Sequence, residues 1–235
     1  MATAVEVGVT GLVGSHILKT LLAHPAFSSV HAYSRKPLPS TSPKLCAITN
    51  TDSSAWPSSF PQNSRIFFSA LGTTKAQAGG FENQRKIDYD LNLDLAKAAK
   101  DAGVETYVLI SSGRADANSG FPYLRMKGEL EEAVKELGFK HTVILTPGLI
   151  VGQREDSRPV EAVARTIASF LGSISGGMLK NSWAQDADVI AKAAVSAGLQ
   201  ALEGKKEPGV WTVSQSDIIR LGLTEWKEPA ATAEN

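Results

Sequence analysis

The chain has 235 residues, of which 43% are hydrophobic and 20% are charged, a composition typical of one folded globular domain. Lysine and arginine together number 24, as do aspartate and glutamate, so no overall field favours nucleic acid or an anionic membrane. The single cysteine, Cys46, excludes an internal disulfide framework and a cysteine-based metal cluster, which fits a reducing compartment. The four histidines are dispersed without metal-ligand spacing, so we expect no metal site.

No run of the sequence approaches the roughly 20 apolar residues that a membrane-spanning helix needs. A glycine motif begins at Gly8, and cleavage of a presequence would remove part of it. We therefore expect neither a transmembrane segment nor a removable signal, whereas peripheral association with a membrane stays open.

Segments with strand-like and helix-like patterns alternate along the chain. Strands are predicted over residues 4–8, 30–34, 45–49, 65–70, 106–111, 141–146 and 210–213. Helices are predicted over residues 12–23, 82–102, 123–137, 159–171, 186–203 and 215–221, and Pro- and Ser-rich loops over 36–43 and 50–64. The alternation predicts an α/β fold, namely a Rossmann-type, doubly wound and mostly parallel sheet with helices on both faces.

The first predicted strand runs into a glycine turn that leads directly into a helix. A strand, a glycine turn and a helix together can cradle a pyrophosphate, which lies against backbone N–H groups at the positive end of the helix. The residues of this cradle are Gly8, Thr10, Gly11, Leu12, Val13 and Gly14. The glycine spacing is GxxGxxG and not the standard GxGxxG, so a tight turn of purely structural use is the alternative.

The second predicted strand ends in Ser34, Arg35 and Lys36. A site that prefers NAD would present an acidic residue to the ribose hydroxyls about 20 residues after the glycine turn. A hydroxyl and two cations at this place suit the 2′-phosphate of NADP, because a guanidinium can bind a phosphate through two hydrogen bonds. The alternative interpretation is a solvated basic loop.

The fourth predicted strand is followed by Leu71, Gly72 and Thr73. In open α/β sheets, ligands bind at the carboxyl ends of the strands, and small or hydroxylated residues there can line a cofactor. A simple strand-to-helix loop is the alternative.

Two serines, Ser111 and Ser112, end the fifth predicted strand, and Tyr123 and Lys127 follow it four residues apart. That spacing places the tyrosine and the lysine on one face of a helix. The ordered set of glycine turn, serine and Tyr-x-x-x-Lys resembles the short-chain dehydrogenase/reductase superfamily over nearly the whole chain.

The finer resemblance is to atypical members of that superfamily. The segments "GVTGLVGS", "ALGTTKAQAG", "LISSGRADANSGFPYLRMKGELE", "LTPGLIVGQREDSRPVE" and "FLGS" are similar to the Tat-interacting oxidoreductase-like proteins. They are especially similar to the fungal group of that family, which is attached peripherally to the mitochondrial outer membrane. The resemblance implies the same location for this protein.

The resemblance also implies a role for each matched residue. The pyrophosphate would be bound by Gly8, Gly11 and Gly14, and the catalytic residues would be Ser112, Tyr123 and Lys127. The cofactor would also contact Ser111, and a turn beside the nicotinamide would be formed by Pro147 and Gly148. Two positions depart from the family pattern. Asp88 stands where the superfamily usually has an asparagine, and Thr146 stands where an arginine often precedes the Pro-Gly turn.

These observations predict an NADP(H)-dependent oxidoreductase that reduces a small carbonyl substrate. Tyr123 would donate the proton and Ser112 would hold the carbonyl oxygen, while Lys127 would lower the pKa of the tyrosine from its ordinary value near 10. The alternatives are an NADP(H)-sensing or scaffolding protein without turnover, and an epimerase or lyase acting on a nucleotide-linked sugar. A short C-terminal lobe disfavours the large substrate of the latter.

We expect residues 1–235 to form a single NAD(P)-binding domain. Residues 152–183 and 204–226 would contribute a small C-terminal substrate lobe, and residues 227–235 would form a disordered tail. No nucleic-acid partner is expected, and the sequence leaves the oligomeric state open.

Overall fold

The computed structural model describes residues 1–151 and 184–228. Within these residues, seven parallel strands form one sheet in the order β3-β2-β1-β4-β5-β6-β9. The strands are β1 (Ala2–Val7), β2 (Phe27–Ser34), β3 (Leu45–Thr49), β4 (Ile66–Ser69), β5 (Thr106–Ile110), β6 (His141–Leu145) and β9 (Gly209–Val213). The strand order reverses between β1 and β4, which is the point at which doubly wound sheets bind ligands. The predicted Rossmann-type sheet is confirmed.

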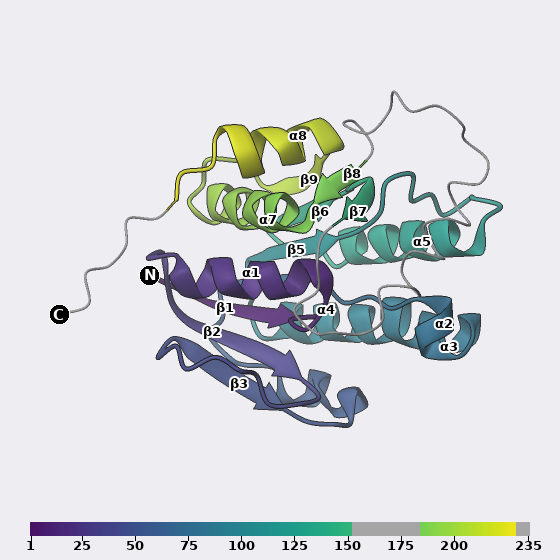
Figure 1. The fold of residues 1–235 in the computed structure, drawn as a ribbon, viewed down its shortest axis with the longest axis horizontal. Helices are drawn as coiled ribbons and strands as arrows, with labels where there is room; N and C mark the ends of the chain where they lie inside the picture. The colour runs from purple at the N-terminus through teal and green to yellow at the C-terminus, as the bar shows by residue number, and fades with distance from the viewer. Residues whose placement is uncertain (152–183, 229–235) are drawn as a thin grey trace.

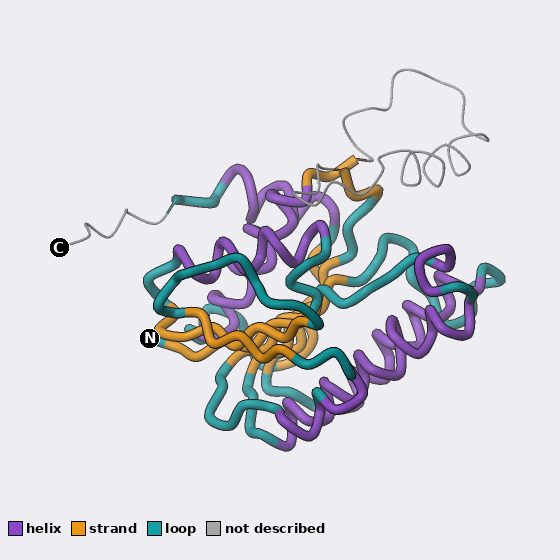
Figure 2. Tube along the Cα trace, turned by 60° about the horizontal axis from the view of Figure 1, so that its bottom comes forward, coloured by secondary structure: helices purple, strands orange, loops and turns teal. Residues whose placement is uncertain are grey.

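Helices cover both faces of this sheet (Figure 1). On one face α1 (Leu12–Ala23) packs against α7 (Ala187–Leu202), which in turn contacts α8 (Gln215–Ile219). On the other face α4 (Asn92–Asp101) contacts α5 (Pro122–Glu136). In Figure 2 the orange strands run between the two layers of purple helices.

Alternate residues of each strand build a separate apolar core on each face. In β1, Ala4 belongs to the core under α1 and α7, whereas Val5 and Val7 belong to the core under α4 and α5. Because both faces are covered, the central strands have few polar residues. Glu6 is the exception in β1, and its side chain is fully buried.

The helix predicted over residues 82–102 consists of three consecutive pieces. They are α3 (Phe81–Arg85), the π-helical segment η3 (Lys86–Leu91) and α4, and a short helix that was not predicted, α2 (Lys75–Ala78), precedes them. Apolar spacing cannot reveal a π-helical turn, because the one extra residue per turn leaves the flanking helical pattern in place. Such turns are frequent at functional sites.

Four further short elements were not predicted. They are η1 (Ser53–Ala55) and η2 (Pro57–Ser59), in a segment predicted as a loop, and the parallel pair of strands β7 (Leu149–Val151) and β8 (Ala184–Asp186). Each has three residues, which is too short to show a period in the sequence. The π-helical segment η4 (Arg220–Thr224) begins inside the helix predicted over 215–221 and extends beyond it.

The structure places residues 204–226 in the main body of the molecule. They were predicted to contribute to a small substrate lobe, but β9 instead pairs along β6 as the last strand of the sheet, and α8 and η4 pack against α7. The remainder of the predicted lobe, residues 152–183 with the helix predicted over 159–171, lies outside the described residues, as do residues 229–235 of the predicted tail.

Candidate active site

The glycine turn after β1 is shaped by two very close backbone approaches. Gly8 has a φ of +84°, and a Cβ there would lie 2.3 Å from the Ala70 carbonyl oxygen. A Cβ on Gly14 would lie 2.1 Å from the Gly8 carbonyl oxygen, which also accepts a 2.8 Å hydrogen bond from the Gly11 N–H. Larger residues at Gly8 and Gly14 would therefore push the turn away from α1 and from the end of β4.

The turn leaves the N-terminus of α1 without a side-chain cap. Gly11 is the N-cap residue and makes no side-chain hydrogen bond to the helix, and the first turn contains no acidic residue. Thr10 is exposed and Leu12 is half-buried, whereas the Val13 side chain is buried in the core, so Val13 can offer a ligand only its backbone. An uncapped helix N-terminus is suited to an anion.

The basic residues at the end of β2 lie next to this turn, because β2 pairs in parallel with β1. Ser34 is 3% exposed, and its hydroxyl donates a 2.6 Å hydrogen bond to the Lys36 carbonyl, so it shapes the loop. Arg35 and Lys36 are exposed and make no ion pair within residues 1–151 and 184–228. Their charges are therefore available to an anionic ligand.

The loop after β4 is held from the helix side. The Thr73 N–H donates a 2.7 Å hydrogen bond to Asp88 Oδ1, and Gln84 Nε2 donates a 2.9 Å hydrogen bond to the Thr73 carbonyl. Leu71 is half-buried and Gly72 is exposed. The loop Leu71–Thr73 thus presents a fixed backbone at the carboxyl edge of the sheet.

A buried asparagine does lie on the helix after β4, and it is Asn92. Its side chain is fully buried, accepts a 2.5 Å hydrogen bond from the Ser69 hydroxyl, and donates 3.3 Å bonds to the carbonyls of Leu71 and Asp88. The sequence analysis did not single out this residue. A polar residue among the apolar positions of the predicted helix 82–102 was the available signal.

The structure brings Ser112 and Tyr123 together. The Ser112 side chain acts on the Tyr123 phenol and opposes the rise of its pKa, while the Ser112 hydroxyl donates a 3.4 Å hydrogen bond to the Gly113 carbonyl. The tyrosine as a whole is 42% exposed at the start of α5. Lys127, one helical turn further, is 4% exposed, and its ammonium donates a 3.4 Å hydrogen bond to the Ile110 carbonyl at the end of β5.

Ser111 is turned away from this pair. Its hydroxyl is buried and donates a hydrogen bond to Glu131 Oε1, four residues beyond Lys127 on α5. The cofactor contact predicted for Ser111 would therefore have to come from its backbone, because the hydroxyl is already bonded within the protein.

Burial dominates the electrostatics of the site. Burial raises the pKa of Asp88 to about 6, although the Lys127 ammonium, the Thr73 N–H and Gln84 act in the opposite direction. Burial also lowers the pKa of Lys127, against the opposing effects of Asp88 and Glu131. The pKa of Tyr123 is raised by burial and by Asp88, with the Ser112 side chain opposing. The predicted lowering of the Tyr123 pKa by Lys127 is therefore not found in this structure, in which the charge of Lys127 acts on Asp88 and Glu131.

The Pro147–Gly148 turn after β6 is tied to the neighbouring loops. The Pro147 carbonyl accepts a 2.7 Å hydrogen bond from the Gly113 N–H, next to Ser112, and the Gly148 N–H donates a 3.1 Å bond to Gln185 Oε1. Gln185 is 4% exposed and also donates a 2.9 Å bond to the Gln215 carbonyl at the start of α8. Gln185 is a second residue that the sequence analysis missed, because its partners lie far away in the chain.

Thr146, which replaces the expected arginine, has a structural use. Its backbone N–H and its hydroxyl both donate to the Val213 carbonyl, at 3.0 and 3.3 Å, and so join the ends of β6 and β9. The Thr146 side chain is thus already hydrogen-bonded at the edge of the sheet.

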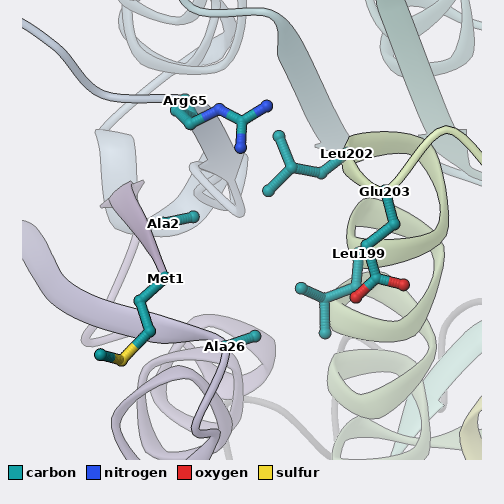
Figure 3. A pocket seen from close by; sticks show the side chains of 7 residues that line it. All are labelled: Met1, Ala2, Ala26, Arg65, Leu199, Leu202 and Glu203. Atoms are coloured by element: carbon teal, nitrogen blue, oxygen red, sulfur yellow. The ribbon is translucent and has the colours of Figure 1, made fainter.

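All of these groups follow the carboxyl ends of parallel strands and therefore share one edge of the sheet. A hollow of about 270 Å³, shown in Figure 3, lies at the opposite edge, where β1 begins and α7 ends. It is lined by Met1, Ala2, Ala26, Arg65, Leu199, Leu202 and Glu203. Because ligands of such sheets bind at the carboxyl edge, we do not assign this hollow to the active site.

Residues 1–151 and 184–228 contain no cluster of three histidine, cysteine, aspartate or glutamate side chains suited to hold a metal ion. Among the same residues, no helix combines the length and apolar character needed to cross a bilayer.

The seven-stranded parallel sheet, its helices and the glycine turn define a Rossmann-type fold. A short chain dehydrogenase family protein from Francisella tularensis shares it with a TM-score of 0.66 and 14% identity, over 92% of this chain and 98% of that chain. The UDP-N-acetylglucosamine 4-epimerase from Methanobrevibacter ruminantium shares it with a TM-score of 0.64 and 18% identity, over 90% of this chain and 76% of that chain. These likenesses establish the fold.

Residues 58–175, about half of the chain, match the HIM1 family. The chain is also 54% identical over 231 residues to "Protein fmp52-1, mitochondrial" of Aspergillus terreus, covering 94% of this chain and 99% of the relative. It is 55% identical over 232 residues to "Protein fmp52, mitochondrial" of Emericella nidulans, with the same coverage of 94% and 99%. The chain therefore belongs to the HIM1 family and to the family of the fmp52 proteins. The closer resemblance to the Tat-interacting oxidoreductase-like proteins stays a prediction.

Proposed function

We propose that this protein is an NADP(H)-dependent oxidoreductase that reduces a small carbonyl compound. The observation that carries the proposal is the placement of Ser112 and Tyr123 together with the buried Lys127, one helical turn beyond the tyrosine on α5. These side chains lie at the carboxyl edge of the sheet, the edge that also holds the glycine turn. A proton donor and a cofactor cradle at one sheet edge suit hydride transfer to a carbonyl.

The residues at this edge fit a nicotinamide dinucleotide that carries a 2′-phosphate. The backbone of Gly11 and the uncapped first turn of α1 would hold the pyrophosphate, and Arg35 and Lys36 would hold the 2′-phosphate. The loop Leu71–Thr73 and the turn Pro147–Gly148 would flank the rest of the cofactor. When bound, the cofactor supplies the hydride.

The side chains of the site would handle the proton. Tyr123 donates a proton to the carbonyl oxygen and Ser112 orients that oxygen. The Lys127 ammonium would stabilise the phenolate left behind only if it turns from Asp88 and Glu131 toward Tyr123 when the cofactor is bound. The raised pKa of Tyr123 keeps the phenol protonated at neutral pH, which is the form a proton donor needs.

A second candidate function is NADP(H) sensing without turnover. One observation favours it, namely that Asp88 and Glu131 stabilise the charge of Lys127. If the lysine stays with these carboxylates when the cofactor binds, the phenolate of Tyr123 has no nearby cation and turnover is slow.

We also propose a location. The relatives from Aspergillus terreus and Emericella nidulans are named mitochondrial, and by that relationship we place this protein peripherally on the cytosolic face of the mitochondrial outer membrane. The test is carbonate extraction together with protease treatment of intact mitochondria. Extraction and cleavage support the proposal, whereas protection from the protease or recovery only in the cytosol contradicts it.

The test of the activity is NADPH oxidation across a panel of small ketones, aldehydes and quinones. We compare the parent with Tyr123→Phe, which keeps the ring and removes the proton donor, and with Tyr89→Phe as a matched control on η3. We expect Tyr123→Phe to bind NADPH but to lose roughly 10²–10⁴-fold in turnover, with the control unchanged. Equal turnover of Tyr123→Phe and the parent would rule out this mechanism. Tight NADPH binding without turnover of any carbonyl would favour the sensing function.

A further inference from the structure

Asp88 connects two parts of the site that lie on different elements. It is 2% exposed and sits in the π-helical segment η3, between the loop after β4 and helix α5. Its Oδ1 accepts the 2.7 Å hydrogen bond from the Thr73 N–H, and its Oδ2 accepts a 3.5 Å bond from Gln84 Nε2. The loop that would flank the cofactor is therefore bonded directly to a buried carboxylate.

On its other side Asp88 faces α5. The charged and titratable groups there are Lys127 and Tyr123, and Glu131 lies beyond the lysine. The loop Leu71–Thr73 contributes no charged side chain, and on its own side of the helix Asp88 meets the neutral Gln84. Lys127 is thus the cation that offsets the charge of Asp88, and Asp88 is one of two carboxylates that keep the buried lysine charged.

We infer that Asp88 is a positioning residue that, when ionised, holds the loop Leu71–Thr73 by a hydrogen bond and balances the charge of the buried Lys127, and that its protonation weakens both links. The Lys127 ammonium itself is hydrogen-bonded to the Ile110 carbonyl, so its link to Asp88 is one of charge. An asparagine at this position could still accept the Thr73 hydrogen bond, but it could not balance the charge of Lys127. The expected effect of Asp88 on cofactor binding depends on the proposed function, whereas the titration of the Asp88 carboxyl does not.

The protonation falls in an accessible pH range. Burial raises the pKa of Asp88 to about 6, so the carboxyl is ionised at pH 7.5 and largely neutral at pH 5. A neutral carboxyl gives a weaker hydrogen bond to the Thr73 N–H and no longer offsets the charge of Lys127. Acidification should therefore weaken both the hydrogen bond to Thr73 and the charge link to Lys127, with one shared midpoint pH.

The direct test follows the Thr73 amide and the Lys127 side-chain Cε by NMR between pH 4.5 and 8 in the full chain. We expect both signals to move with one shared midpoint near 6 in the parent. The same should hold in the control Asp90→Asn, which removes an exposed carboxylate from the same segment. In Asp88→Asn both signals should stay flat over that range. Absence of titration in the parent, or two separate midpoints, overturns the inference without reference to any variant.

The functional test measures NADP⁺ affinity by calorimetry at pH 7.5 and pH 5. We expect the affinity of the parent to fall more steeply than that of Asp88→Asn, with a difference of roughly tenfold between the two proteins. Titration of the 2′-phosphate of the ligand affects both proteins equally and cancels. An equal fall of NADP⁺ affinity in the parent and in Asp88→Asn contradicts the coupling between Asp88 and cofactor binding. Absence of NADP⁺ binding at either pH contradicts the proposed function, and the NMR titration still decides the role of Asp88.

Discussion

At the scale of a single residue, Arg35 offers the sharpest test of the proposed preference for NADPH over NADH. Its exposed guanidinium has no acidic partner in the described part of the chain and stands beside the glycine turn. We expect the parent to bind NADPH more tightly than NADH. Arg35→Ala should remove most of the preference, because it loses charge-assisted hydrogen bonds worth about 1.5–3 kcal/mol. Arg65→Ala, at the opposite edge of the sheet, is the matched control. Equal affinities of the parent for the two nucleotides, measured calorimetrically, would contradict the prediction.

Single residues were predicted correctly where the signal is local. The four-residue spacing of Tyr123 and Lys127 places both on α5, because helical periodicity needs no knowledge of other elements. Asn92 and Gln185 were missed since their partners come from distant loops. The pKa of Tyr123 was predicted in the wrong direction, because burial cannot be read from two residues on one helix.

The glycine turn packs directly against the first turn of α1, and a substitution at Gly14 tests whether this close packing is required. A Cβ at this position would lie 2.1 Å from the Gly8 carbonyl oxygen and 2.7 Å from the Gly8 carbonyl carbon, and both are backbone atoms that cannot rotate away. We expect Gly14→Ala to lower the free energy of unfolding by roughly 1–3 kcal/mol or more and to abolish NADPH binding. Gly120→Ala is the control, because a Cβ there meets nothing within 4 Å. Urea unfolding curves that coincide for the two variants would show that the close approach is not required.

The elements themselves were predictable to different degrees. The strand predicted over residues 45–49 coincides with β3, because a short β-rich run between loops leaves few alternatives. The helix predicted over 82–102 has the right position but hides the π-helical segment that carries Asp88. β7 and β8 have three residues each, and their pairing depends on contacts between segments remote in the sequence.

At the scale of the whole molecule, the sheet could be predicted from the sequence, but the burial of the carboxyl group of Glu6 could not. Alternation of strands and helices was enough to predict the layers, because most connections between parallel strands are helical crossovers that pack on the sheet. The connection from β2 to β3 is an exception, since it contains no helix. The placement of β9 in the sheet was not predicted, since a short strand near the end of the chain fits a separate lobe equally well. Glu6 lies near the end of β1, between β2 and β4, and neither carboxyl oxygen has a hydrogen-bond partner among the described residues.

Glu6 should make the stability of the whole fold depend on pH. Complete burial raises its pKa well above the ordinary value of 4.5, so the folded state favours the protonated form. A raised pKa gives stability that is fully present below pH 4.5 and is lost as the pH rises toward the folded-state value. Glu6→Gln cannot ionise. We therefore expect its free energy of unfolding, relative to the parent, to increase by about 1.4 kcal/mol per pH unit above that point and then to level off. Urea unfolding from pH 4.5 to 8 measures this difference, with Glu132→Gln on the exposed side of α5 as the control. If the difference between Glu6→Gln and the parent does not change with pH, the burial of Glu6 does not control the pH dependence of folding.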